Sequence, residues 1–344
     1  MKKRIIISVA ALLIISALLF LCSALVVPKY TAQKQLEGRL SGEYYGEVGD
    51  HDVLFIGDCE VYESFVPAVL WQKYGISSYV RGTPSQLAWQ SYYLLEDTFR
   101  YEKPKAVVYN VQAVVNGESE KNEAMNRMTL DGMRWSLSKV SAIFASMTEE
   151  ESFLDYVFPL LRYHSRITEL GSDDFKYAFK APDTVSHSGY LMQTGVVPMV
   201  AEQGGEVYFE HELPKESMEY LEKMRELCQK NGSELILVKA PTNSSTYWWY
   251  DEWDEQICEY AREKGLAYYN FIPLCEEMGI DWSKDTYDKG EHLNVYGAEK
   301  YTEYFGNILV TKHGVEDRRA DTELSGLWEA RVKRYNEDKN KGGQ

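Results

Sequence analysis

The sequence predicts an α/β fold, a flavodoxin-like parallel sheet with helices on both faces. Two observations carry this prediction: short β-type runs alternate with helical periods, and the run 234–238 is apolar enough to be a central strand. The expected strands are 52–56, 78–81, 106–111, 234–238 and 267–271.

Helices are predicted between these strands, where apolar side chains recur every three or four residues. In the segment 216–230, Met218, Leu221 and Met224 form such a stripe, which is typical of a helix packed on a core. Asn231-Gly232 then gives a C-terminal capping signal. The expected helices are 85–101, 216–230, 254–264 and 295–310, with a further helix placing Pro67 in its first turn.

The first residues predict a membrane anchor. A basic tip, Met1-Lys2-Lys3-Arg4, precedes the uncharged run 5–27. At about 1.5 Å per residue, this run spans roughly 35 Å as a helix, enough for a bilayer core of ~30 Å. A cleaved signal peptide has a shorter apolar region, and the residues before Cys22 lack the small side chain of a lipoprotein cleavage site. The positive-inside rule then places the N-terminus in the cytoplasm and the chain after Pro28 outside.

The rest of the chain reads as one large domain with flanking segments. We expect a cytoplasmic tip and transmembrane anchor at 1–28, a polar stalk at 29–50, and an α/β domain at 51–311. The insertion 117–213 is far longer than an ordinary crossover and is expected to form a helical cap over the edge of the active site. The charged tail 312–344 is expected to be a helix that frays into disorder.

Charge and cysteine usage exclude some function classes. The chain has 53 Asp and Glu against 37 Lys and Arg, a net charge of −16. This acidity argues against nucleic acid and against tight docking on anionic lipid, and it is compatible with neutral or basic glycan groups. The five cysteines show no repeated spacing, so a disulfide framework is not expected and at most one pair would form.

The segment from Val53 to Glu60 is the strongest candidate for chemistry. An apolar strand runs into Gly57-Asp58, a turn that would present Cys59 at its tip. The N-terminus of a following helix lowers the pKa of a cysteine and favours the reactive thiolate. The alternative is a buried structural cysteine, which is a common state of free cysteines.

A loop late in the chain supplies the candidate base. His292 stands directly before a predicted amphipathic helix. Asp288 is our choice to orient its imidazole, because Gly290 lets the loop curl back, and Asp285 is the rival.

Together, Gly57-Asp58-Cys59 and the late Asp-loop-His292 block resemble the SGNH (GDSL-type) hydrolase and acyltransferase superfamily, with Cys in place of the nucleophilic Ser. The likeness is greatest to its membrane-anchored branch, which includes the D-alanyl-transfer protein of teichoic acid systems and alginate O-acetyltransferase-like proteins. Lys289 occupies the position expected for the acid, and Asp288 lies one residue earlier.

The resemblance implies three oxyanion donors: the backbone N–H of Cys59, Gly82 after the second strand, and a side chain after the third. Asn110 or Gln112 could supply the last donor, although the family's Gly-x-Asn-Asp block is absent. Each of these residues could equally serve an ordinary turn or strand end.

An aromatic segment follows the fourth strand, on the side of the sheet where the carboxyl ends of the strands meet. Trp248 and Trp249 are its candidate glycan-binding residues, because aromatic faces stack on sugar rings. The alternative is packing of the following helix onto the core.

These features predict an extracytoplasmic, membrane-anchored acyltransferase or esterase that acts on O-acyl groups of a cell-surface polysaccharide. The resemblance implies a membrane-bound O-acyltransferase as partner. No metal or cofactor is expected, because no metal-ligand spacing and no phosphate-binding or dinucleotide motif is present. The alternative is a non-catalytic glycan-binding or scaffold subunit of a surface-polymer acylation complex, since a Cys in place of Ser fits either a transferase or a site that only binds.

Overall fold

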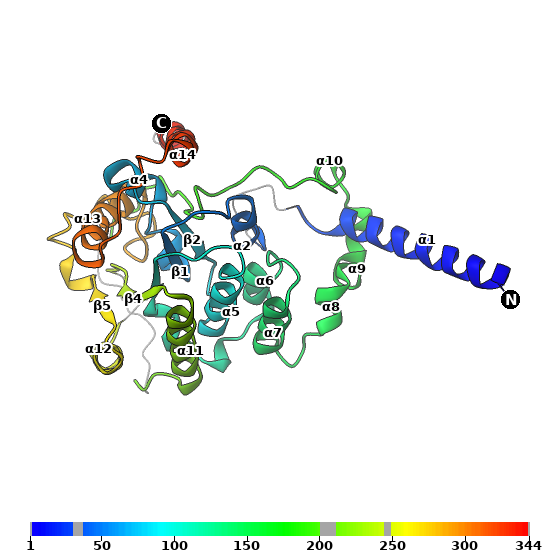
Figure 1. The fold of residues 1–344 in the computed structure, drawn as a ribbon, viewed down its shortest axis with the longest axis horizontal. Helices are drawn as coiled ribbons and strands as arrows, with labels where there is room; N and C mark the ends of the chain where they lie inside the picture. Colours follow the sequence, from blue (N-terminus) through cyan, green and yellow to red (C-terminus); the bar gives the residue numbers. More distant parts are fainter. Residues whose placement is uncertain (1, 30–36, 200–210, 244–248, 343–344) are drawn as a thin grey trace. The chain divides into compact units, whose positions relative to one another are not determined.

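A parallel five-stranded sheet of order β2-β1-β3-β4-β5 forms the centre of the molecule (Figure 1). The computed structural model describes residues 2–29, 37–199, 211–243 and 249–342. The strand order is that of the flavodoxin-like doubly wound fold and confirms the predicted fold class. The strands, each within two residues of its predicted ends, are β1 (Val53–Gly57), β2 (Ser78–Gly82), β3 (Ala106–Asn110), β4 (Glu234–Lys239) and β5 (Ala267–Asn270).

Helices cover both faces of this sheet. The helices α4 and α13 pack together on one face, where Phe305 of α13 contacts Phe55 of β1, and α5 and α11 pack together on the other (Figure 1). The predicted C-terminal cap at Gly232 is present in a left-handed conformation, and Gly265 ends its helix in the same way. The main helices of the α/β unit are α3 (Cys59–Tyr62), α4 (Pro67–Tyr74), α5 (Ala88–Thr98), α11 (Lys215–Asn231), α12 (Asp251–Lys264) and α13 (Val295–His313).

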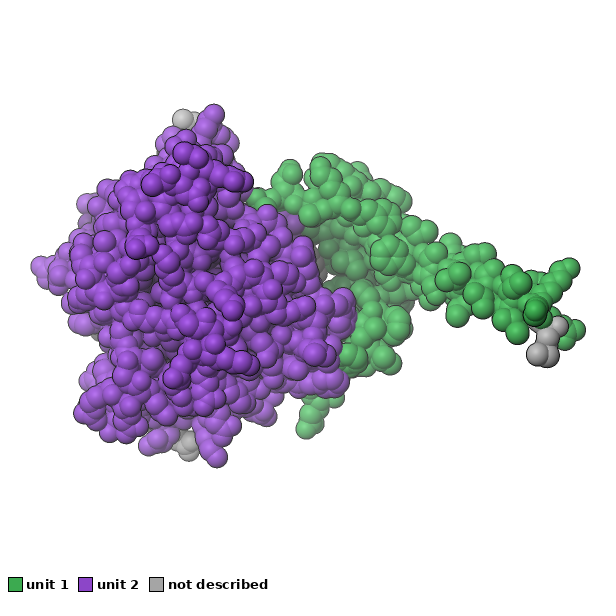
Figure 2. All heavy atoms as spheres, in the orientation of Figure 1, with its two compact units in different colours: residues 1–36, 147–185 green, residues 37–146, 186–344 purple. Residues whose placement is uncertain are grey.

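The chain divides into two compact units. Unit 1 comprises residues 1–36 and 147–185, and unit 2 comprises 37–146 and 186–344 (Figure 2). Unit 1 contains α1 (Lys2–Val26), which is long and apolar enough to cross a membrane and is consistent with a single-pass anchor or a signal sequence. Its other helical elements are α8 (Phe153–Val157), α9 (Pro159–Tyr163), η4 (His164–Thr168) and α10 (Ser172–Lys176).

Part of the predicted stalk belongs to unit 2. The described residues from 37 to 50 include α2 (Arg39–Glu43) and η1 (Tyr44–Gly46), and both tyrosines of this segment are buried. Tyr44 donates a hydrogen bond to Glu102, and its ring lies 4.0 Å from the guanidinium carbon of Arg81. Two adjacent aromatic side chains bind this segment to the domain, and this corrects the stalk prediction for 37–50.

The insertion also differs from the prediction. Its first helices, α6 (Glu123–Leu130) and α7 (Leu137–Ser146), contact α2 and α5 in unit 2, while residues 147–185 group with α1. Residues 186–199 return to unit 2 and hydrogen-bond to the loop before α13. The insertion is therefore split between the two units and does not form one helical cap. Short elements elsewhere are η2 (Val111–Val115), η3 (Glu118–Glu120) and η5 (Ile272–Leu274).

The C-terminal segment 312–344 is folded through most of its length. It completes α13 and then forms α14 (Thr322–Gly342), which packs on α4. Trp328 is fully buried and stacks on Trp71 with ring centroids 5.5 Å apart. The buried side chains of α14 are Leu324, Trp328 and Tyr335. Three widely spaced apolar side chains hold this highly charged helix in place. The helix expected in the tail is present and extends to Gly342, whereas its packing on α4 was not predicted.

Candidate active site

Cys59 lies where the turn after β1 enters α3. Gly57 has φ 153°, and a Cβ there would lie 2.6 Å from Val61 Cγ2, so this turn requires glycine. The side chain of Asp58 accepts a hydrogen bond from the backbone N–H of Glu60 at 3.1 Å and caps α3. The sequence predicted the turn, but α3 is a single turn of helix that precedes the predicted helix at Pro67.

The thiol of Cys59 is buried, which differs from the predicted exposed tip. Only 9% of the residue is exposed. Burial raises the pKa of the Cys59 thiol to about 11, opposed by the charge of His292 and a side-chain hydrogen bond with it. The negative charges of Asp58 and Glu63 raise this pKa further. The net shift of the thiol pKa is therefore upward, opposite to the expected lowering, because burial dominates in this geometry.

Asp288 holds the imidazole of His292. Its Oδ2 lies 2.6 Å from Nδ1 of His292, and its Oδ1 accepts the backbone N–H of His292 at 2.8 Å. The intervening Lys289 and Gly290 both have positive φ, so the loop curls back as the glycine suggested. With Nδ1 bonded to a carboxylate, Nε2 is the ring nitrogen placed to exchange a proton with a thiol.

Asp285, the rival orienter, is engaged elsewhere. Its carboxylate is 2.5 Å from the ammonium of Lys300 and accepts the backbone N–H of Asp281 at 2.7 Å. Asp288, not Asp285, is the aspartate that the structure brings to His292.

The surroundings of His292 favour its charged form. Burial alone lowers the pKa of an imidazole, but the charge of Cys59, the hydrogen bond to Asp288 and the charge of Glu63 raise the pKa of His292 well above its ordinary value. Burial likewise tends to raise the pKa of Asp288, yet its bonds to His292 lower it. The imidazole and the carboxylate thus stabilise each other's charges.

A second carboxylate, Glu63, was missed from the sequence. Its Oε2 lies 3.6 Å from Nδ1 of His292, and the hydroxyl of Tyr287 donates to both of its oxygens at 2.9 Å. Burial raises the pKa of Glu63, and the charge of His292 opposes this. The available signal was spacing: Glu63 follows Cys59 by four residues, which places both on one side of a helical turn.

A buried ion pair between α3 and the sheet was also missed from the sequence. Lys239, at the end of β4, lies 2.6 Å from Oε1 of Glu60, and these side chains are 0% and 2% exposed. The amide of Asn110 donates to Oε2 of Glu60 at 2.8 Å. This cluster joins α3 to the carboxyl ends of β3 and β4, and thereby fixes the helix that carries Cys59.

The predicted oxyanion donors lie close to the turn of Cys59. Gly82 pairs with Gly57 across β1 and β2, and a Cβ at Gly82 would lie 3.0 Å from the carbonyl oxygen of Asp58. Asn110 uses both ends of its amide within the protein, since its Oδ1 accepts the backbone N–H of Ala240 at 3.4 Å. These contacts favour a structural role for Asn110. Its alternative, Gln112, is buried in η2.

Of the two candidate glycan-binding tryptophans, Trp248 lies outside the described residues. Trp249 is half-buried, donates its indole N–H to Asp254 at 2.9 Å, and makes an edge contact with Trp253. These contacts fit the alternative of packing at the start of α12.

Among the residues that the structure describes, one group of side chains offers metal-ligand atoms. Single atoms of Asp288, Glu291 and His292 lie within 4.8 Å of one another. The bond between Asp288 and His292 already accounts for this proximity. We therefore assign no metal to it.

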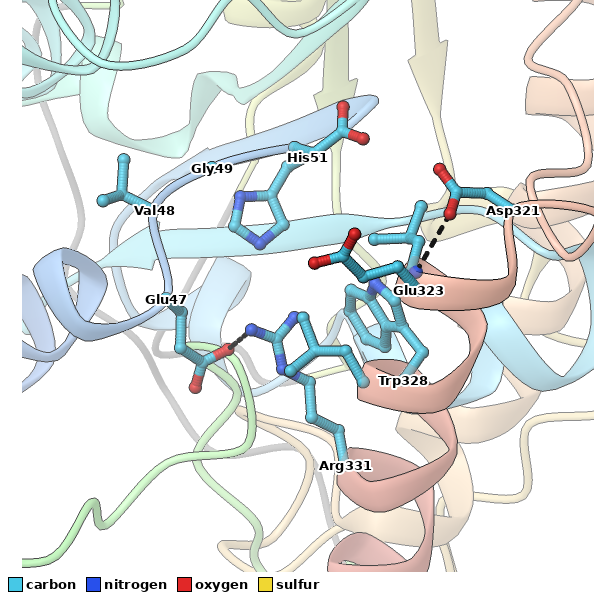
Figure 3. A pocket seen from close by; sticks show the side chains of 11 residues that line it. Glu47, Val48, Gly49, His51, Asp321, Glu323, Trp328 and Arg331 are labelled. Atoms are coloured by element: carbon cyan, nitrogen blue, oxygen red, sulfur yellow. Dashed lines mark hydrogen bonds and ion pairs between the residues drawn. The ribbon is translucent and has the colours of Figure 1, made fainter.

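The opposite end of β1 borders a pocket of about 520 Å³ (Figure 3). His51, Trp328 and Arg331 line it, and Arg331 pairs with Glu47 at 3.1 Å. His51 precedes β1 whereas Cys59 follows it, so this pocket adjoins the amino end of the strand and not the candidate active site.

No protein-family model matches the chain, and no curated protein matches it. Among solved structures, it is similar to a candidate lipolytic protein of the G-D-S-L family from Desulfitobacterium hafniense DCB-2. The two are 16% identical, the match covers 76% of this chain and 100% of that chain, and the TM-score is 0.39. Likeness at this level does not establish a family, and the fold class rests on the sheet order itself.

Proposed function

We propose that this chain is a membrane-anchored ester hydrolase or acyltransferase that uses Cys59 as nucleophile. The observation that supports it is the position of the His292 imidazole, bonded to Asp288 through Nδ1 and interacting with the Cys59 thiol. A nucleophile, a base and an orienting acid are the parts that acyl transfer requires. The SGNH-like motifs point to the same class of reaction.

Proton transfer at the moment of attack is central to this proposal. Burial raises the thiol pKa, so Cys59 gives up its proton only as sulfur adds to the acyl carbon. The acceptor is the neutral form of His292, which is present once the pH has risen through the raised pKa of that imidazole. The oxyanion that forms would accept hydrogen bonds from the backbone N–H groups of Cys59 and Gly82. When this tetrahedral intermediate collapses, the alcohol of the substrate ester leaves with the proton from His292, and the acyl group remains on Cys59 as a thioester. His292 then deprotonates water or a second alcohol, and attack of that oxygen releases the acyl group and restores the thiol.

The proposed substrates are O-acyl groups of a cell-surface polysaccharide. The support is the candidate anchor α1, the net charge of −16, and the motif resemblance to polymer-modifying proteins. In this arrangement the N-terminus is cytoplasmic, unit 2 is outside, and a membrane-bound O-acyltransferase supplies the acyl group.

A second candidate is a non-catalytic glycan-binding or scaffold subunit. Two features of Cys59 favour it: the side chain is buried, and its pKa is raised to about 11. A site of this kind would hold the same residues together without turning over an ester.

The two candidates differ in whether Cys59 becomes acylated. The full-length protein would be incubated with p-nitrophenyl acetate and with an O-acetylated polysaccharide, followed by mass spectrometry of its cysteine peptides. We expect a hydroxylamine-sensitive acetyl group on Cys59, no turnover by Cys59→Ala, and partial turnover by Cys59→Ser. Cys258→Ala is the matched control, because Cys258 is exposed on α12. Acetate release unchanged in Cys59→Ala would exclude the proposed nucleophile, and loss of polymer acylation only on deletion of the whole protein would favour the scaffold.

A further inference from the structure

Unit 1 exposes a group of large apolar side chains beside its candidate membrane helix. They come from α8, α9, η4, α10 and the residues that follow, and each is more than half exposed. Single exposed apolar residues are ordinary, but several of them on short elements that contact one another or the same helix mark a binding surface. This apolar group consists of Leu154, Phe158, Leu161, Ile167, Phe175 and Phe179.

The contacts with α1 set the depth of this group. The ring of Phe179 lies 6.2 Å from the ring of Phe20, and α9, η4 and α10 all contact α1. Figure 1 shows α9 beside the end of α1. Phe20 precedes Val26, the last residue of α1, by six positions, or roughly 9 Å along the helix axis. If α1 spans a bilayer, a side chain beside Phe20 lies at or below the boundary between headgroups and hydrocarbon.

Cationic side chains mark the C-terminal end of α1. The guanidinium of Arg166 donates to the carbonyl of Val26, and the ammonium of Lys29 donates to the carbonyl of Ala24. Arg166 also donates to Asp174 of α10 at 3.0 Å. Cations that bond the last carbonyls of a spanning helix are typical of the membrane–water interface. The same bonds fix α10 and η4 at the level of that interface.

The charge of the segment favours apolar adhesion over electrostatic attraction. Between 153 and 180 the basic residues are matched by as many acidic ones. They are Arg162, Arg166, Lys176 and Lys180 against Asp155, Glu169, Asp173 and Asp174. Binding should therefore occur on a neutral bilayer and should persist in high salt.

We propose that residues 153–179 form an interfacial platform that inserts its apolar group into the bilayer leaflet at the C-terminal end of α1. This inference rests on the proposal that α1 is retained as a membrane span, and it is independent of the chemistry at Cys59. The occupant is the lipid itself, because the group is continuous with a helix whose own surface is suited to lipid. Unit 1 then holds the membrane both by one span and by a lateral contact.

Photolabelling with a lipid tests the platform in the intact protein. Full-length chain in phosphatidylcholine vesicles, with a diazirine in the acyl chain of a tracer lipid, is irradiated and its adducts are located by mass spectrometry. We expect adducts on α1 and on the apolar group, and few on Trp135, Leu137 and Phe144, which are apolar residues of unit 2 that are also more than half exposed.

Paired substitutions separate insertion from chance contact. Phe158→Asp with Phe179→Asp should remove at least four-fifths of the platform adducts and leave those on α1, whereas Leu137→Asp with Phe144→Asp should change neither. Adducts on α1 alone would overturn the platform, as would chain-to-chain cross-links at the apolar group in place of lipid adducts. Absence of adducts on α1 itself would overturn the anchor on which the inference rests, so the two failures are distinguishable.

Discussion

Two buried histidine–carboxylate pairs stand at opposite ends of β1. At the carboxyl end, Nδ1 of His292 lies 2.6 Å from Asp288, and at the amino end, Nδ1 of His51 lies 2.9 Å from Glu102. The two histidine residues are 9% and 4% exposed. Burial and a carboxylate partner therefore do not distinguish a candidate catalytic histidine from a structural one.

The two histidines differ in what else surrounds each imidazole besides its first carboxylate. His292 interacts with the thiol of Cys59 and has a second carboxylate, Glu63, at 3.6 Å. The ring of His51 instead packs against the aromatic rings of Tyr79 and Trp328. A nucleophile within reach of the imidazole, and not the imidazole's acid partner, makes one end a candidate active site.

The largest expected effect is the loss of activity in His292→Gln. Removing a general base typically costs about 10²- to 10⁴-fold in rate, so we expect ester turnover to fall by that order. His51→Gln should change turnover by less than about threefold, because it touches no reacting atom. The measurement is kcat/KM with an ester substrate on the full-length variants, alongside their thermal unfolding.

The two variants are matched controls for each other. His51→Gln should lower Tm, since it disturbs a buried bond to Glu102, and should leave turnover nearly unchanged. Equal losses of turnover in both variants would break the comparison and assign His292 a structural role as well.

The second expected effect compares two ion pairs, one at the carboxyl ends and one at the amino ends of the strands. Lys239 and Glu60 are fully buried below α3, whereas Arg331 and Glu47 border the pocket at the amino end and are partly exposed. Breaking a buried pair leaves an uncompensated charge, so Lys239→Met should cost about 3–5 kcal/mol in the free energy of unfolding. Arg331→Met should cost about 1 kcal/mol or less.

Denaturant unfolding of the full-length variants measures both costs. Combining Lys239→Met with Glu60→Gln should recover part of the loss, because no charge is then left without its partner. If Lys239→Met were as mild as Arg331→Met, the cluster would not be what fixes α3.

The fold could be predicted largely from local pattern. The strands and the main helices follow apolar runs and glycine caps that act over a few residues, and these appear within two or three residues of their predicted ends. The packing of α14 could not be predicted this way, because its three buried side chains are spread among charges and bury only against residues such as Trp71 that lie far away in the sequence. The prediction for the segment 37–50 was wrong for a similar reason. Tyr44 is held in the domain by a contact with Arg81, which lies far away in the sequence.

The site was predictable where chemistry is carried by neighbours in the sequence. Asp288 and His292 lie four residues apart, and the turn at Gly57 is a local signal. The pairing of Glu60 with Lys239 joins residues 179 positions apart, and no local pattern encodes it. The burial of Cys59, which sets its pKa, is likewise a property of the packed surroundings and not of the turn.

The smallest expected effect is a shift in the pH at which activity rises. Only the pair of His292 and Asp288 should control this pH. The pKa of His292 is raised above its ordinary value, so its neutral, base form appears only as pH rises through that raised pKa, and activity should rise there too. Asp288→Asn removes the negative partner, so this rise should move to lower pH while the maximal rate falls. Glu102→Gln should leave the rise in activity where it is.

The stability losses of Asp288→Asn and Glu102→Gln should depend on pH in different ways. The raised pKa of His292 contributes stability below the ordinary histidine pKa, which is lost as pH rises through the raised value. Although burial tends to raise the pKa of Glu102, its bonds to His51 and Tyr44 lower it, so its contribution is present above the ordinary carboxyl pKa and is lost as pH falls through the lowered one. Unfolding followed across pH should therefore show Asp288→Asn losing stability mainly at neutral and lower pH, and Glu102→Gln losing it mainly above the ordinary carboxyl pKa, with its deficit shrinking in acid. A shift of the activity profile by Glu102→Gln, or none by Asp288→Asn, would show that Asp288 does not set the proton affinity of His292.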